Sequence, residues 1–204
     1  RDEVQAMARV PGLQRALAFY RLNLRFEGNR EWIWAIRGFD DKQLLAAAEF
    51  ARRHELYDRA INTAEKTVEL HDFSMRYLAP YRDVRQDYGR QQGLDEAWVY
   101  GLIRQESRFI ADARSRAGAT GLMQLMPATA RWVAQKIGLK DFRWTGVSDV
   151  GTNINLGTWY LRHVLDALDN HPGLAAAAYN AGPGRARGWR AGTPMEAAVY
   201  AETI

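Results

Sequence analysis

The sequence predicts an all-α protein. Apolar residues recur three and four positions apart along most of the chain, which is the spacing of one helical face. The alternation of Val, Ile and Thr that is typical of half-buried strands is missing. A length of 204 residues allows two modest domains, and the segment Leu78-Ala79-Pro80-Tyr81 interrupts the helical pattern. We therefore place the boundary near residues 75–90 and assign residues 1–85 and 86–204 to the two domains.

The first part is predicted to consist of consecutive helices. Asp40 or Asp41 can act as the N-cap of the third helix. The last two helices are separated by about two residues, so we expect an antiparallel helical hairpin. Such hairpins suggest a tetratricopeptide-like scaffold by analogy, although no strict repeat of about 34 residues is present. The helices predicted here span residues 13–24, 31–37, 40–54 and 56–70.

The second part alternates helices with glycine-rich loops. Pro127 and Pro172 stand where proline is favoured, in the first turn of a helix. Gly138 can end the helix that Pro127 begins, and Gly182-Pro183-Gly184 closes the alanine-rich helix after Pro172. The segments 110–121 and 142–147 are predicted to be loops. The predicted helices span residues 82–92, 95–109, 127–137, 150–168, 172–181, 185–190 and 195–202.

Charge and composition narrow the function classes only partly. The net charge of +4 and the pI near 9.5 suit an anionic polymer, such as nucleic acid, a membrane surface or an acidic cell wall. The basic residues are scattered and form no nucleic-acid fingerprint, so we expect no nucleic-acid partner. The apolar runs are too short to span a membrane. The chain contains no cysteine, and its four histidines lack metal-ligand spacing, so neither a metal nor another cofactor is expected.

The stretch from Asp95 to Phe109 carries the first candidate for chemistry. Val99, Leu102 and Ile103 fall on one helical face, and Glu106 is the next residue on that face. Burial would raise the pKa of this carboxyl, and a protonated acid near neutral pH can donate a proton to a leaving group. A glutamate at a helix end that simply reaches solvent fits the same pattern. From the helix alone, both interpretations stay open.

Two further segments contain residues suited to binding a polar ligand. The glycines of the loop 118–130 allow the backbone to approach a ligand closely, and Gln124 offers both a donor and an acceptor. Tyr179 and Asn180 end an alanine-rich helix, where a hydroxyl and an amide could orient a carboxylate or a sugar. Each signal also has a purely structural interpretation: a loop that enters a helix, a packed tyrosine, or an asparagine before a helix-ending glycine.

Taken together and in order, these segments closely resemble the catalytic domain of the soluble lytic transglycosylases, a lysozyme-like glycosidase family acting on peptidoglycan. The resemblance covers about residues 94–204, and residues 1–93 look like the linker and superhelical scaffold of the large soluble members. It implies an all-α fold in which a helical-hairpin scaffold precedes a lysozyme-like catalytic domain. The segments that carry it are IRQESRF, SRAGATGLMQLMPATA, NINLGTWYL and AAYNAGPGR.

The resemblance also implies roles for single residues. Glu106 matches the one catalytic acid/base of the family, and Ser115 matches a serine near the bound N-acetylmuramic acid. Tyr179 matches a tyrosine whose hydroxyl bonds the catalytic glutamate. The remaining matches are substrate-binding residues: Gln124 and Met126 lining the glycan groove, Asn180 beside the tyrosine, and Glu202 near the sugar subsites.

The absence of a second carboxylate motif near Glu106 shapes the expected reaction. Glycosidases that use two side-chain carboxylates hold them about 5–10 Å apart. Asp112, Asp141 and Asp149 lie in loops, where turn or cap roles are expected. The substrate can supply the nucleophile instead, through attack of its own C6 hydroxyl. The expected product then has a 1,6-anhydro ring, formed by cleavage between N-acetylmuramic acid and N-acetylglucosamine.

Two alternatives remain open at this point. One is a peptidoglycan hydrolase like the goose-type lysozymes, with water in place of the C6 hydroxyl. The other is a non-catalytic helical scaffold that binds glycan or a partner protein. The resemblance implies a monomer in the periplasm or bacterial cell envelope that acts on glycan strands, with cell-wall synthesis enzymes as possible partners. We also expect the catalytic domain to be truncated at its C-terminus, because the family continues beyond Glu202-Thr203-Ile204.

Overall fold

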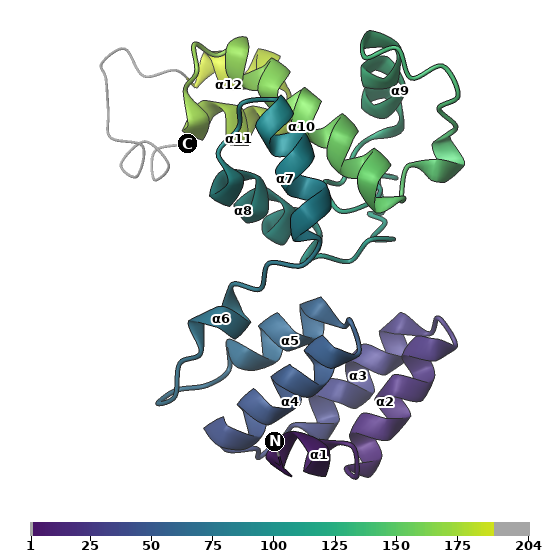
Figure 1. Ribbon diagram of the computed structural model, residues 1–204, viewed down its shortest axis with the longest axis vertical. Coiled ribbons are helices and arrows are strands. Elements are labelled where there is room, and N and C mark those ends of the chain that lie inside the picture. Colours follow the sequence, from purple (N-terminus) through teal and green to yellow (C-terminus); the bar gives the residue numbers. More distant parts are fainter. Residues whose placement is uncertain (1, 190–204) are drawn as a thin grey trace. The chain divides into compact units, whose positions relative to one another are not determined.

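The computed structural model describes residues 2–189, without the side chains of residues 84–86. These residues form α-helices, one short 3₁₀ turn and two isolated bridges, with no strand in the described range (Figure 1). The predicted all-α class is confirmed. The chain divides into two compact units, Arg1–Pro80 with Arg108–Ile110, and Tyr81–Ser107 with Ala111–Ile204. The predicted boundary between residues 85 and 86 stays a prediction; the compact units divide after Pro80.

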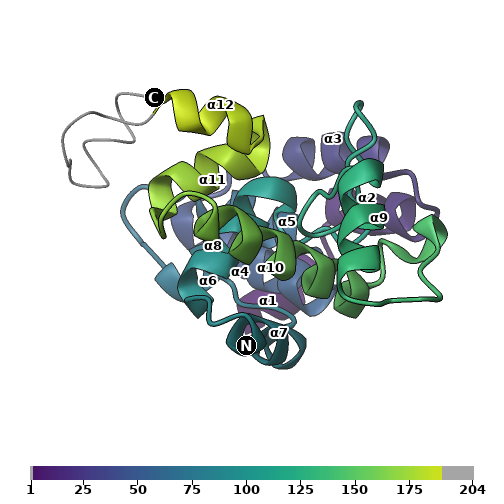
Figure 2. The same ribbon diagram turned by 90° about the horizontal axis from the view of Figure 1, so that it is seen from above.

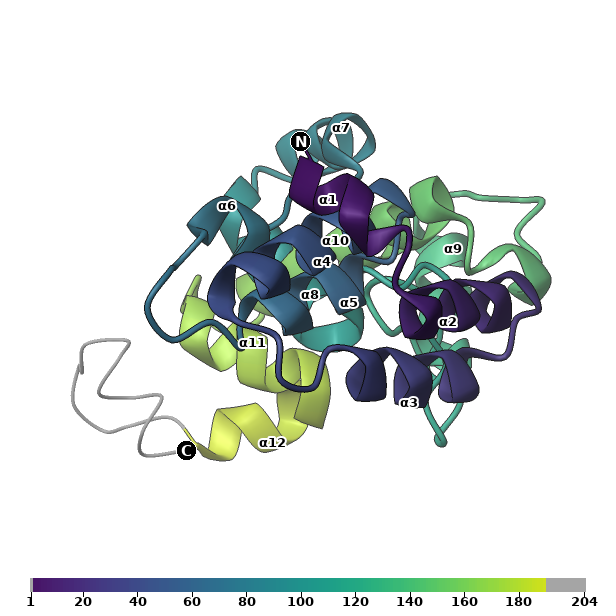
Figure 3. The same ribbon diagram turned by 90° about the horizontal axis from the view of Figure 1, so that it is seen from below.

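The first unit is built from helix pairs. Helices α2 and α3 pack against each other, as do α4 and α5, so the predicted pairing of the last two helices is confirmed (Figures 1 and 3). Helix α1, which was not predicted, packs against α4. The helices of this unit are α1 (Asp2–Met7), α2 (Pro11–Arg21), α3 (Arg25–Ala35), α4 (Asp41–Arg53), α5 (Tyr57–Ala64) and α6 (Phe73–Arg76).

The helix bounds predicted for residues 13–37 were wrong. The first helix ends at Arg21 because Asn23 adopts the left-handed backbone conformation, with φ 59°. The next helix begins at Arg25 rather than residue 31. Gly28 weakens the helical signal there, yet a Cβ at this position would lie 2.8 Å from the Tyr20 ring. The glycine that obscured the helix in the sequence thus permits the two helices to approach closely.

The helix predicted for residues 56–70 was also too long. Helix α5 ends at Ala64, whose carbonyl accepts a 3.0 Å hydrogen bond from the Thr67 hydroxyl. The carboxylate of Asp41 then accepts backbone N–H bonds from each of residues 68–70, the shortest 2.6 Å long. Val68, within the range predicted to be helical, is 74% exposed. The Asp41 carboxylate therefore takes the place of helical carbonyl acceptors at residues 68–70, and the short helix α6 follows without having been predicted.

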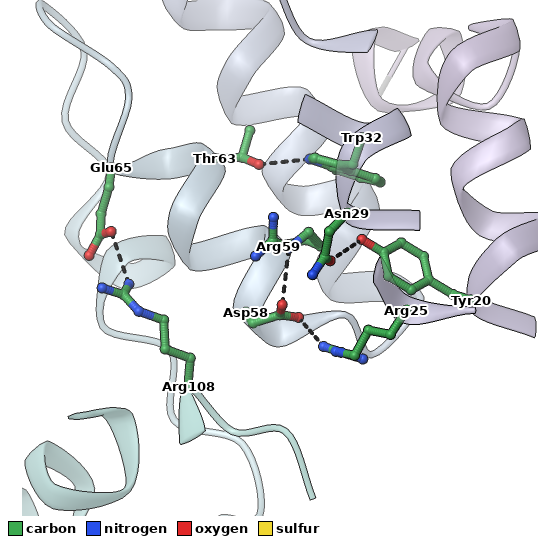
Figure 4. Close-up of polar contacts among 9 residues, drawn as sticks. All are labelled: Tyr20, Arg25, Asn29, Trp32, Asp58, Arg59, Thr63, Glu65 and Arg108. Atoms are coloured by element: carbon green, nitrogen blue, oxygen red, sulfur yellow. Dashed lines mark hydrogen bonds and ion pairs between the residues drawn. The ribbon is translucent and has the colours of Figure 1, made fainter. Parts of the chain in front are cut away.

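A buried polar network joins the helices of the first unit (Figure 4). Asp58 is only 3% exposed, and its carboxylate accepts from Arg25 at 2.6 Å and from Arg59 at 3.0 Å. Two more bonds link side chains in the same region, from Trp32 to Thr63 at 3.0 Å and from Tyr20 to Asn29 at 2.7 Å. These partners satisfy polar groups that would otherwise be costly to bury.

The second unit is arranged around its longest helix, α10, which contacts α7, α9 and α11 (Figure 2). Helices α11 and α12 lie side by side (Figures 2 and 3). The last predicted helix, residues 195–202, lies outside the described residues. The helices of this unit are α7 (Arg82–Gln91), α8 (Glu96–Ser107), α9 (Pro127–Lys136), α10 (Val150–Asp166), α11 (Pro172–Ala181) and α12 (Pro183–Gly188), with the 3₁₀ turn η1 (Trp144–Gly146) before α10.

Candidate active site

Helix α8 carries Glu106 in its last turn. The Asp95 carboxylate accepts the N–H of Trp98 at 3.0 Å at the start of this helix. The apolar face predicted from the spacing is buried, with Val99 at 0% and Ile103 at 2% exposure. That burial fixes the rotation of the helix, and the same rotation places the Glu106 carboxyl at the edge of the core.

The environment of Glu106 favours its protonated form. Burial raises the pKa of the Glu106 carboxyl above its usual value of 4.5, and a hydrogen bond from the Asn180 side chain partly opposes this effect. No arginine, lysine or histidine within residues 2–189 forms an ion pair with this carboxyl. A carboxyl held by a neutral amide, with no cation to stabilise its charge, is suited to general acid work.

Helix α11 supplies the two neighbours that the sequence singled out. Asn180 donates to Glu106, as just described. The Tyr179 hydroxyl donates a 2.8 Å bond to the backbone carbonyl of Met123, and its ring packs 5.3 Å from that of Tyr160. Burial raises the pKa of Tyr179, and the negative charge of Glu106 raises it further. The Tyr179 hydroxyl thus uses its proton in the hydrogen bond to Met123, and its oxygen can still accept a hydrogen bond.

The loop before α9 is held by its own polar groups. Thr120 pairs with Leu125 through two backbone bonds of 3.0 Å. Gln124, with φ 44°, donates its side-chain amide to the carbonyls of Ala113 and Gly121 at 3.0 and 2.8 Å. The expected sugar-binding donor of Gln124 therefore bonds within the loop in this structure, which leaves its amide oxygen for a ligand. Its role toward substrate stays a prediction.

A buried asparagine that the sequence analysis did not single out organises this loop. Asn153 of α10 is fully buried and accepts the N–H of Met123 at 2.8 Å. Its amide donates to the carbonyls of Thr120 at 3.1 Å and Val147 at 2.8 Å. A Cβ on Gly121 would lie 2.1 Å from the Asn153 amide nitrogen, so only glycine fits there. The signal in the sequence is an asparagine within the otherwise apolar face of α10.

Ser115 and Met126, the other two loop candidates, are exposed. The Ser115 hydroxyl oxygen accepts the N–H of Ala119 at 3.0 Å and so closes a turn. Met126 is 42% exposed, whereas its neighbour Leu125 is buried at 2%. A methionine exposed at the start of α9 agrees with a place on a ligand-binding surface, but no contact tests this role. Glu202, the last candidate, lies outside the described residues.

A cavity of about 370 Å³ opens beside the Glu106 neighbourhood. Its polar groups come from Gln105 and Asn180, and Trp98 and Leu102 give it apolar walls. Trp98 and Gln105 were not predicted as site residues, although they fall seven positions apart on one face of α8. The lining residues are Ala97, Trp98, Gly101, Leu102, Gln105, Ala176 and Asn180.

A larger cavity of about 640 Å³ lies in the first unit and is lined from α2 and α3. Two carboxylates line it, Glu27 and Glu31, and Glu31 forms an ion pair with Arg15 at 2.6 Å. The smaller cavity is the better candidate active site, because one of its lining residues, Asn180, is the hydrogen-bond partner of Glu106, whose pKa is raised.

The described part of the chain shows neither a metal-binding cluster nor a membrane-spanning helix. No group of three or more His, Cys, Asp or Glu residues there could hold a metal ion. None of the described helices is long and apolar enough to cross a membrane. Asp149, one of the three loop aspartates, caps α10 by accepting the N–H of Thr152 at 2.8 Å. Its expected cap role is confirmed, and its pKa is lowered mainly by that backbone bond.

Comparisons with known proteins point to one family. A family model described as Transglycosylase SLT domain matches residues 83–199, and one described as Soluble lytic murein transglycosylase L domain matches residues 6–69. The chain is 29% identical over 202 residues to the soluble lytic murein transglycosylase of Salmonella typhimurium and 27% identical to that of Escherichia coli. These matches cover 98% of this chain but 31% of each relative, so the chain spans about a third of the length of the curated relatives it matches.

Solved structures agree with the sequence comparisons. The lytic transglycosylase Slt of Pseudomonas aeruginosa, solved as an inactive glutamate-to-glutamine mutant, matches with a TM-score of 0.86 and 35% identity. That match covers 100% of this chain and 33% of the other chain. The 70-kDa soluble lytic transglycosylase of Escherichia coli matches with a TM-score of 0.76 and 27% identity over 90% of this chain and 30% of that chain. The predicted lysozyme-like, all-α fold is thereby confirmed.

Proposed function

The chain belongs to the Transglycosylase SLT domain family, and from this premise we propose that it is a peptidoglycan lytic transglycosylase with Glu106 as its acid/base. The observation that supports this most is the state of Glu106: a half-buried carboxyl of raised pKa, held by the neutral amide of Asn180. A raised pKa favours the protonated form of the carboxyl, and that form can deliver its proton to a glycosidic oxygen.

The proposed reaction needs one carboxyl acting twice. Protonated Glu106 donates to the oxygen of the β-1,4 bond between N-acetylmuramic acid and N-acetylglucosamine, and that bond breaks. The Glu106 carboxylate then accepts the proton of the C6 hydroxyl as this oxygen attacks C1 of the same sugar. The product is a 1,6-anhydro ring, and no water is consumed. A tethered nucleophile has a high effective concentration, which favours ring closure over attack by water.

The surrounding residues fit supporting roles. Tyr179 can accept a hydrogen bond from protonated Glu106, since its own proton is donated to Met123. Asn180 would stabilise the carboxylate after the first proton transfer. Ser115, Gln124 and Met126 are proposed to hold the glycan strand.

The setting of the reaction is also proposed from the family. We expect a monomer in the periplasm or cell envelope that acts on glycan strands, with cell-wall synthesis enzymes as possible partners and without a cofactor. The soluble and membrane-bound lytic murein transglycosylases among the matches support an envelope protein.

The test is a product analysis. The full chain is incubated with purified glycan strands, and the released fragments are identified by mass spectrometry. Fragments with 1,6-anhydro ends are expected. Fragments with reducing ends would instead indicate a hydrolase of the goose-type lysozyme kind, and binding without any cleavage would indicate a non-catalytic glycan-binding scaffold.

A further inference from the structure

The larger cavity of the first unit, about 640 Å³ in volume, takes no part in the proposed chemistry but has the size of a ligand site. Residues of α2 and α3, which lie side by side (Figure 3), and Arg37 just after α3 line it. The lining residues of α3 recur three and four positions apart, so one face of this helix forms a wall. The charged residues of the cavity are Arg15, Glu27, Arg30, Glu31 and Arg37.

Two large apolar side chains of this wall are open to solvent. Trp34 is 62% exposed, and Ile33 beside it is 45% exposed. Burial of an indole ring would be favourable, so a tryptophan left open in a concave surface is available to a ligand. Exposed apolar groups gathered in a groove, rather than scattered singly, are typical of binding surfaces.

Two arginines of the cavity hold their guanidinium groups against aromatic rings. The Arg37 guanidinium lies 4.3 Å from the centre of the Trp34 ring, and that of Arg30 lies 5.7 Å from the centre of the Phe26 ring. Neither arginine forms an ion pair with any residue that the structure describes. Stacking orients a planar guanidinium and leaves its N–H donors free. Arg30 and Arg37 can therefore bind a carboxylate from outside the chain.

The acidic residues of the cavity limit the kind of anion that fits it. Glu31 is paired with Arg15, whereas Glu27 has no ion-pair partner within the described part of the chain. A polyanion, such as a nucleic-acid backbone or an acidic membrane surface, would bring its negative charges against Glu27. A small peptide that carries both carboxylates and an amino group can instead match the arginines and the free glutamate together.

We propose that this cavity binds the stem peptide of peptidoglycan, the short peptide that carries free carboxylates and an amino group beside the sugars. Its carboxylates bond to Arg30 and Arg37 through paired N–H donors, and its amino group pairs with Glu27. Its aliphatic part lies against Trp34. This inference rests on the proposed function, because peptidoglycan is the proposed substrate.

The test is an NMR titration of the full chain with the stem tripeptide Ala–γ-Glu–diaminopimelate. The indole N–H signal of Trp34 should shift on binding. R30A and R37A are each expected to weaken binding by about three- to tenfold, since each removes charged hydrogen bonds at an exposed site. R21A is the matched control, because it removes an exposed arginine of α2 that does not line the cavity, and it should leave Kd within about twofold.

The variant E27Q separates the stem peptide from other anions. It should weaken binding of the tripeptide, which loses the partner of its amino group, and strengthen binding of duplex DNA or of anionic phospholipid vesicles, which lose a repulsion. Tripeptide binding that R30A and R37A leave unchanged would overturn the proposal. So would equally tight, arginine-dependent binding of duplex DNA or vesicles, or a dimer of the chain that R37A dissociates.

The titration needs no turnover, so the site and the proposed function can fail separately. Arginine-dependent binding of the tripeptide by a chain that releases no anhydro product would support the site and refute the proposed function. Anhydro product from a chain that does not bind the tripeptide would refute the site alone.

Discussion

The most buried of the described carboxyls in the first unit and the candidate acid of the second unit have opposite kinds of partner. Asp58 of the first unit is 3% exposed and bonded by two guanidinium groups, at 2.6 Å from Arg25 and 3.0 Å from Arg59. Glu106 of the second unit is half-buried, and its described partner is the neutral amide of Asn180. The first carboxyl belongs to a buried ion pair that links helices, whereas burial without a charged partner among the described residues raises the pKa of the second.

The partners of a buried carboxyl distinguish one that stabilises the fold from one that can donate a proton. Both residues depart from the rule that carboxyls avoid the interior. In the first unit the carboxylate of Asp58 and the guanidinium groups of Arg25 and Arg59 compensate each other's charge. In the second unit the desolvation of Glu106 is left uncompensated by any cation among the described residues, which costs stability but creates a proton donor. Four predictions test this comparison.

The largest effect is expected from E106Q. Glutamine keeps the shape of the side chain but cannot transfer a proton, so cleavage should fall by about 10²–10⁴-fold while glycan binding is retained. Release of anhydro fragments is the measurement, and E96Q, in the first turn of the same helix, is the control. Cleavage by E106Q close to the parent rate would refute the assignment of the acid.

The same substitution has a predicted effect on stability. The folded-state pKa of Glu106 is raised, so between its usual value of 4.5 and the folded value the folded state binds more protons than the unfolded chain. Stability of the parent therefore falls as pH rises through that window. E106Q removes this loss and should be more stable than the parent at neutral pH, with the difference vanishing below pH 4.5 in thermal unfolding.

The second prediction concerns D58N. The substitution removes the charge that two arginines share, and it leaves Arg59, whose side chain is 11% exposed, without its counter-ion. Breaking a buried pair in this way costs about 3–5 kcal/mol in the free energy of unfolding. Denaturant unfolding of the full chain measures it. A loss below about 1 kcal/mol would mean that Asp58 is not a structural ion-pair partner in the sense argued here.

The fold was predictable where helical periodicity and proline punctuation agree. The bounds of α4, α9 and α11 follow from an N-cap aspartate or an N-terminal proline and a periodic apolar face. The prediction failed where tertiary contacts override local signals. Gly28 lies inside α3, where the Tyr20 ring packs against it, and the predicted helix does not extend over residues 68–70, because their amides bond to Asp41. Neither partner is close in sequence.

The third prediction concerns the Asn180 amide, which bonds Glu106 where Asp58 has arginine partners. N180A removes the hydrogen bond that lowers the Glu106 pKa, so the pKa should rise. The alkaline limb of the kcat profile should then move to higher pH. The loss in kcat should be within about tenfold, the value of one hydrogen bond. N155A on α10 is the control, and an alkaline limb that stays in place or moves to lower pH would contradict the prediction.

The candidate site was predictable only as separate pieces. The position of Glu106 at the end of an apolar stripe identified the acid, and the Tyr179-Asn180 pair identified its neighbour. The sequence could not reveal that the Tyr179 proton goes to Met123, 56 positions away, or that Asn153 holds the loop from 33 positions away. Such bonds depend on which helices meet. A buried asparagine on an apolar face was the one signal present in the sequence that could have indicated the second of them.

The smallest effect is expected from E49Q, which separates burial from the number of charged partners. Glu49 has two arginine partners like Asp58, Arg52 at 2.6 Å and Arg53 at 2.8 Å, but these side chains are 45% and 49% exposed. The hydrogen bond from Arg52 and then that from Arg53 lower the Glu49 pKa from 4.5 to about 2. Solvent screening should nevertheless hold the loss in E49Q to about 1 kcal/mol or less.

The pH dependence follows from the same lowered pKa. The stabilisation by Glu49 is fully present above pH 4.5 and is lost as pH falls toward about 2, so E49Q and the parent should converge in unfolding experiments at low pH. Added salt should reduce the difference at neutral pH, whereas the D58N loss should persist in salt because that pair is buried. If E49Q cost as much as D58N, the number of arginines rather than burial would determine the strength of these pairs. The difference between Asp58 and Glu106 would then depend on their partners and not on their burial.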